Sequence, residues 1–81
     1  MRVMEKTIFA GQRIKITTDG KTFFLYSRSE SNWKLKEKNS PGKTMYSEAL
    51  ESMKEIFSAD ISEEEKILKI MNSGFFSISN L

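Results

Sequence analysis

Two strand-like segments around Asp19-Gly20 constrain the fold of this chain more than any other feature. Arg13–Thr17 alternates polar and apolar residues strictly, which is the period of a half-buried strand. Lys21–Ser27 is rich in β-branched and aromatic residues, which suit a second strand. Asp19-Gly20 is a strong signal for a two-residue hairpin loop. The sequence therefore predicts an antiparallel hairpin in which Thr18 faces Lys21.

This hairpin has two chemically different faces. One face is aliphatic and aromatic, with Ile14, Ile16, Phe23 and Leu25. The other face is mixed, with Arg13, Lys15, Thr17, Thr22, Phe24 and Tyr26. We expect helices to cover the first face, because burying the lysine and arginine side chains of the second face would be costly. Sequence alone leaves open the alternative, in which the helices cover Phe24 and Tyr26.

A third strand is predicted over Trp33–Lys38, where apolar and charged residues alternate again. A five-residue loop over 28–32 would place Trp33 and Leu35 on the aliphatic face. The same register would place Lys34, Lys36 and Lys38 on the face of Phe24. Shorter strands are predicted at Thr7–Phe9 and Lys43–Tyr46.

Helices are predicted in the second half of the chain. Apolar residues follow a helical stripe from Ala49 to Phe57, with Ser47 as the expected N-cap. Ser62–Glu65 has the spacing of a capping box, and a second stripe follows it. Phe75–Ser79 is the expected last strand. These elements predict one α+β domain over residues 1–81. It has a small antiparallel sheet of three to five strands with two C-terminal helices packed on one face, in the order β-β-β-(β)-α-α-β.

Composition excludes several classes of chemistry. The chain has no cysteine and no histidine, so thiolate nucleophiles, imidazole bases, disulfides and the usual zinc, haem and iron–sulfur ligands are absent. Asp60 and Glu63–Glu65 form a carboxylate cluster, but consecutive helical residues point in different directions. We therefore expect no enzyme, no metal and no cofactor.

Charge is divided unequally along the 81 residues. Residues 1–45 hold ten of the 13 Lys and Arg residues but four of the 11 Asp and Glu residues. Cations that flank exposed rings can neutralise phosphates while bases stack on the rings. The candidate nucleic-acid-binding residues are Arg13, Lys15, Phe24, Tyr26, Arg28, Lys34, Lys36 and Lys38.

The expected function is that of a non-enzymatic protein that binds a polyanion, RNA or single-stranded nucleic acid, through this basic and aromatic face. The alternative is an inhibitor or antitoxin-like module of the phage or mobile-element type that docks on a host enzyme and blocks it, with acidic helix residues such as Glu48, Glu51 and Glu55 as a second contact surface. No apolar run follows the first residues, so we expect a cytoplasmic protein without a membrane segment. A domain this small would gain stability from a homodimer.

The stretch from Arg13 to Phe57 resembles small modules that have a three-stranded sheet and a helix, such as the arm-binding domains of phage integrases. The resemblance rests on the alternating strands, on Trp33-Lys34-Leu35, and on Tyr46-Ser47-Glu48-Ala49 at the expected start of a helix. It implies a helix packed against the sheet. A short, cysteine-free chain rich in Lys, Ile and Ser is also typical of phage accessory proteins.

Overall fold

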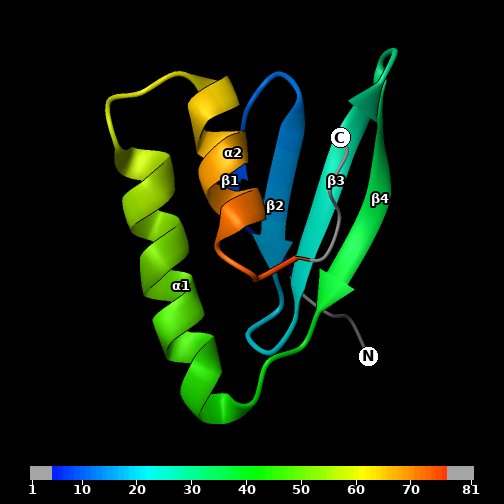
Figure 1. Ribbon diagram of the computed structural model, residues 1–81. Coiled ribbons are helices and arrows are strands. Elements are labelled where there is room, and N and C mark those ends of the chain that lie inside the picture. Colours follow the sequence, from blue (N-terminus) through cyan, green and yellow to red (C-terminus); the bar gives the residue numbers. More distant parts are fainter. Residues whose placement is uncertain (1–4, 77–81) are drawn as a thin grey trace.

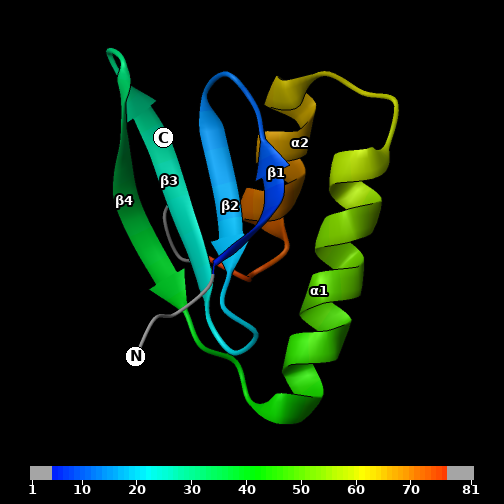
Figure 2. The same ribbon diagram turned by 180° about the vertical axis from the view of Figure 1, so that it is seen from behind.

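The computed structural model describes residues 5–76 of the chain, and it confirms an α+β fold. The elements are β1 (Lys6–Ala10), β2 (Ile14–Thr18), β3 (Phe23–Ser29), β4 (Asn32–Asn39), α1 (Lys43–Ser58) and α2 (Glu63–Asn72). The strands form one antiparallel sheet in the order β1-β2-β3-β4. Both helices lie on the same side of the sheet, at its β1 and β2 end, and neither of them covers β4 (Figures 1 and 2).

The hydrophobic core lies between the helices and the aliphatic face of the hairpin, as predicted. Ile14, Ile16, Phe23 and Leu25 are completely buried. The helices contribute Ala49, Met53, Phe57, Ile67 and Ile70, and Phe76 closes the core after α2. Neither α1 nor α2, the helices of the described residues, is long and apolar enough to cross a bilayer. We call the core side of the sheet the inner face and the opposite side the outer face.

The β2–β3 hairpin differs from the predicted register. Thr18 pairs with Phe23 rather than with Lys21, so the loop runs over residues 19–22. The Asp19 carboxylate accepts hydrogen bonds from the backbone N–H groups of Lys21 and Thr22 at 2.9 and 2.8 Å, which holds a wider turn. These two hydrogen bonds lower the pKa of Asp19, and the one from Thr22 has the larger effect. The register shift is two residues, so every side chain keeps its predicted face.

The β3–β4 connection is tighter than predicted, and this changes the faces of β4. Ser29 pairs with Asn32, and the turn residue Glu30 has a φ of 59°. The five-residue loop is therefore wrong. Trp33 and Leu35 pair with Arg28 and Tyr26 on the outer face instead of joining the aliphatic face. The interpretation failed because β4 is an edge strand without a helix over it, and Leu35 remains 48% exposed.

The first helix begins earlier than the sequence predicted. Lys43–Tyr46 is its first turn rather than a strand, and the N-cap is Gly42 instead of Ser47. Tyr46 explains the difference, because its ring stacks on Phe23 with centroids 4.7 Å apart. The predicted strand at Thr7–Phe9 is confirmed within β1, which contains a β-bulge between Thr7 and Phe9.

The second helix is capped by Ser62, as predicted, whose hydroxyl accepts a hydrogen bond from the Glu65 backbone N–H at 3.2 Å. After α2, Phe75 and Phe76 are not in a strand. The Asn39 side-chain amide donates to the Phe75 carbonyl and ties this segment to the end of β4. The rest of the predicted last strand, residues 77–79, lies outside the described residues.

Candidate nucleic-acid interface

The outer face, which neither α1 nor α2 covers (Figure 2), carries aromatic rings from β3 and β4. Phe24 and Tyr26 from β3 are half-buried there, as their alternation with buried Phe23 and Leu25 requires. Trp33 from β4 is also half-buried and joins them. Sequence reasoning placed Trp33 on the opposite face, so the structure adds a third ring to the candidate site.

Cations lie directly over two of these rings. The Lys15 Nζ atom is 4.8 Å from the centroid of Tyr26 and 5.3 Å from that of Trp33. The Arg28 guanidinium carbon is 4.9 Å from the Trp33 centroid. Such contacts contribute about 0.5–1 kcal/mol at exposed sites. They hold two positive charges against the rings of Tyr26 and Trp33.

The remaining predicted cations are divided between several places. Lys38 pairs with Phe24 and therefore lies on the outer face. Lys34 pairs with Ser27, so its side chain starts from the inner face, and Lys36 is the extra residue of a β-bulge between Leu35 and Glu37. We therefore count Lys38 with the rings, and we do not count Lys34 or Lys36.

Arg13 lies just before β2, beyond the end of the strand. Its guanidinium reaches toward α2, where it lies 3.9 Å from the carboxylate of Glu64. Both side chains are more than half exposed. An exposed ion pair of this kind contributes little to stability, and it draws Arg13 away from the rings.

Glu5 places a negative charge on the outer face, which sequence reasoning missed. One carboxylate oxygen accepts hydrogen bonds from the Thr17 hydroxyl at 2.5 Å and from the Tyr26 hydroxyl at 3.0 Å. Desolvation by burial, together with this bond to Glu5, raises the pKa of Tyr26. Glu5 precedes β1 and reaches across β2, so its charge lies on the β1 side of the rings.

The acidic cluster at the start of α2 does not converge. Glu63 is directed at the β1–β2 turn, where it binds three backbone N–H groups, and Glu64 is directed at Arg13. Among the described residues, no group of three or more acidic side chains is arranged to hold a metal ion. The clustered carboxylates therefore position the helix.

Comparisons with family models, curated proteins and solved structures found no match for this chain. The interpretation of the outer face therefore rests on its own geometry.

Proposed function

We propose that this protein is a non-enzymatic binding protein that holds RNA or single-stranded nucleic acid on its outer sheet face. The observation that carries the proposal is the position of the helices, which cover the aliphatic inner face. This arrangement leaves three rings, Phe24, Tyr26 and Trp33, on the same face as Lys15 and Lys38. A positively charged surface with rings at its centre is the general design of sheet-surface binders of single strands.

The contacts define how a strand would be held. Tyr26 and Trp33 lie diagonally across β3 and β4, so successive bases can stack on neighbouring rings. Lys15, which contacts both rings, would move from the ring face to the phosphate that joins the two bases. Arg28 and Lys38 would bind the flanking phosphates along the same two strands.

Glu5 limits the side of Tyr26 on which the nucleic-acid backbone can lie. Its carboxylate repels phosphates from the β1 side of Tyr26, while Arg28 from β3 lies over the Trp33 ring. We therefore place the nucleic-acid backbone along β3 and β4 and away from β1.

The test is fluorescence anisotropy of a labelled oligouridylate at several salt concentrations. If Lys15, Arg28 and Lys38 neutralise about three phosphates, log K falls with log salt at a slope of about −2. Removal of both rings, in Tyr26→Ala/Trp33→Ala, should weaken binding by about 2–5 kcal/mol, since stacking contributes about 1–3 kcal/mol per base.

Two control variants match these changes. Leu35→Ala removes an exposed apolar side chain from the same face without removing a ring, and it should leave affinity unchanged. Lys34→Gln should weaken binding less than Lys38→Gln, because only Lys38 shares the face of Phe24. Affinity that is independent of salt and of the rings would refute the proposal. The inhibitor alternative would be favoured if the chain captured a protein partner, if nuclease treatment left that capture intact, and if Leu35→Ala weakened it.

A further inference from the structure

A cavity of about 470 Å³ lies on the helix side of the sheet, at the β1 edge, and is separate from the outer face. Its size falls in the range of small-molecule sites. Side chains that matter for its chemistry come from β1, β2 and α1: Lys6, Ile8, Thr18, Tyr46, Leu50 and Lys54.

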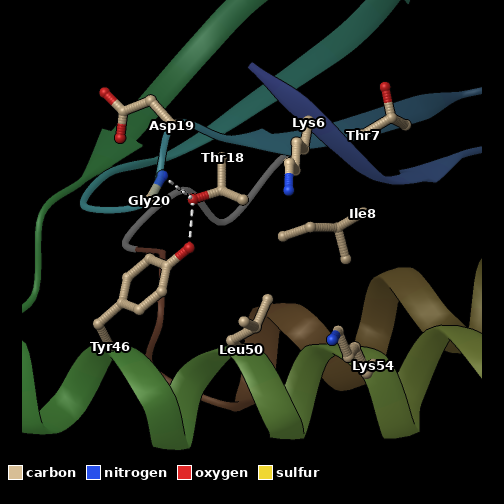
Figure 3. A pocket seen from close by; sticks show the side chains of 9 residues that line it. All are labelled: Lys6, Thr7, Ile8, Thr18, Asp19, Gly20, Tyr46, Leu50 and Lys54. Atoms are coloured by element: carbon tan, nitrogen blue, oxygen red, sulfur yellow. Dashed lines mark hydrogen bonds between the residues drawn. The ribbon is translucent and has the colours of Figure 1, made fainter. Parts of the chain in front are cut away.

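Two lysines line this cavity, and Asp19 is the one acidic residue among the described residues that border it. Figure 3 shows Lys6 extending from β1 and Lys54 lying on α1 at the opposite wall, with Ile8 and Leu50 between them. Within residues 5–76, neither ammonium group forms an ion pair with a carboxylate. Asp19 also borders the cavity, but its carboxylate points away in Figure 3 and is occupied by the backbone amides of the hairpin turn.

Acidic residues beside Lys54 on α1 do not enter the cavity. Glu51 and Glu55 border a separate, open hollow on the exposed side of the helix, which Lys54 also borders. Lys6 and Lys54 are exposed like these acids, so water screens all four charges, while Ile8 and Leu50 give the space between the two lysines an apolar surface. An anion between the two lysines would replace a repulsion between like charges with two attractions.

The hydroxyl groups at the other end of the cavity exclude an anion there. Thr18 donates its hydroxyl proton to the Thr22 carbonyl at 2.9 Å, so Tyr46 must be the donor in the 2.7 Å contact between Tyr46 and Thr18. The Tyr46 oxygen then has only acceptor capacity left. A ligand must therefore place its negative charge at the lysines and a neutral part toward Tyr46.

We infer that this cavity binds a small amphiphilic anion, with a carboxylate or phosphate monoester headgroup between Lys6 and Lys54. A short aliphatic chain packs against Ile8 and Leu50, and the Tyr46 end accepts a hydrogen bond from any donor that the ligand carries. This site is independent of the nucleic-acid face, and its ligand is a free small molecule.

The experiment is a titration of the ¹⁵N-labelled protein, followed by amide chemical shifts, with octanoate and octyl phosphate as probes. Octylammonium tests the sign of the charge, and acetate and inorganic phosphate test the headgroup alone. We expect saturable shifts at Thr18, Gly20 and Leu50 with at least one of the two octyl anions, and the stronger of the two identifies the headgroup. Octylammonium, acetate and phosphate should leave these amides unshifted.

A double variant tests the two lysines. Lys6→Gln/Lys54→Gln should weaken octyl-anion binding roughly tenfold, through the loss of two exposed ionic contacts. The matched control is Lys36→Gln/Lys69→Gln, which removes two exposed lysines elsewhere and should bind as the original chain does. The inference is overturned if octylammonium shifts the same amides equally, if both octyl anions shift none, or if the double variant binds unchanged. Oligonucleotide binding by the double variant tests the outer face separately.

Discussion

Replacement of Glu63 by glutamine should destabilise the fold more than any other surface carboxylate change we predict. Glu63 at the start of α2 accepts hydrogen bonds from three consecutive backbone N–H groups of the β1–β2 turn. The distances are 3.0 Å to Gln12, 2.8 Å to Arg13 and 3.1 Å to Ile14. These bonds join segments about 50 residues apart in the chain, and we call them the Glu63 latch.

Glutamine has nearly the same shape but only one acceptor oxygen. Its carbonyl can still accept from two of the amides, while its NH₂ group must face the third amide as a second donor. The retained bonds also lose the contribution of the charge, and hydrogen bonds to charged groups contribute about 1.5–3 kcal/mol each. Because Glu63 is partly exposed, we take the lower part of this range and expect a total loss of about 2 kcal/mol. For a domain of this size, that corresponds to a decrease in Tm of about 8–16 °C.

The assay is urea unfolding monitored by circular dichroism, with Glu64→Gln as the matched control. Glu64 is the next residue of the same helix, but its contact with Arg13 is an exposed ion pair at 3.9 Å. The control should change the free energy of unfolding by less than about 0.5 kcal/mol. Equal effects of the two substitutions would refute the reasoning, because the latch would then contribute no more than a surface charge.

The latch also predicts a dependence of stability on pH. Burial raises the pKa of Glu63, but the backbone amides of Arg13, Gln12 and Ile14 and the charge of Arg13 lower it, and the net pKa is below the ordinary value of 4.5. A carboxylate with a lowered pKa in the folded state stabilises the fold fully above its unfolded pKa. That stability is lost as pH falls below 4.5 through the lowered folded value. Glu63→Gln should show a weaker loss between pH 5 and pH 3, and Asp19, whose pKa is also lowered, should account for part of the remainder.

Three further predictions follow from single contacts. Gly11→Ala should cost about 1–3 kcal/mol in unfolding experiments, because a Cβ there would lie 2.2 Å from Glu63 Oε2, and the cost should fall when Glu63 is also alanine. Glu5→Gln should raise oligouridylate affinity about two- to fivefold by anisotropy, since it removes a negative charge from the outer face; reduced affinity would contradict the proposed path. Tyr46→Phe should cost about 0.5–1.5 kcal/mol in urea unfolding through loss of the hydrogen bond to Thr18, and a neutral result would show that this bond contributes nothing.

The inner face was predictable because its pattern is redundant. Ile14, Ile16, Phe23 and Leu25 remain on one face whether the hairpin loop has two residues or four, since side chains alternate with a period of two. The Ser62 cap and most of the helical stripes were predictable for the same reason, as periodicity and capping chemistry agree, but Leu68, expected in the second stripe, is 59% exposed. An error in turn type therefore changed the register without changing the core.

The Glu63 latch was not predictable from local pattern. Acidic residues in a first helical turn ordinarily complement the helix dipole, and nothing in Glu63–Glu65 distinguishes the first carboxylate from the next two. The sequence feature that accompanies this contact is Gly11, which leaves room for the Glu63 carboxylate beside the β1–β2 turn. Only the folded arrangement brings the glycine and the glutamate together.

The β-bulge in β4 decides whether the outer face can act as proposed. Lys36 is the extra residue, so Trp33 and Leu35 lie on the outer face before the bulge, whereas Glu37 pairs with Leu25 on the inner face after it. If Lys36 took a regular place in the ladder instead, a strand that kept Trp33 outside would turn Lys38 inward, and the rings would lose that cation. Deletion of Lys36 removes the extra residue, so regular alternation leaves Trp33 and Lys38 both on the outer face. Deletion of Lys36 and Glu37 together would turn Lys38 to the inner face. Oligouridylate affinity should therefore be kept in the single deletion and fall in the double deletion, while the inner face, which β2 and β3 supply, should keep the domain folded. Equal affinity of the two variants would show that the rings and Lys38 do not act together.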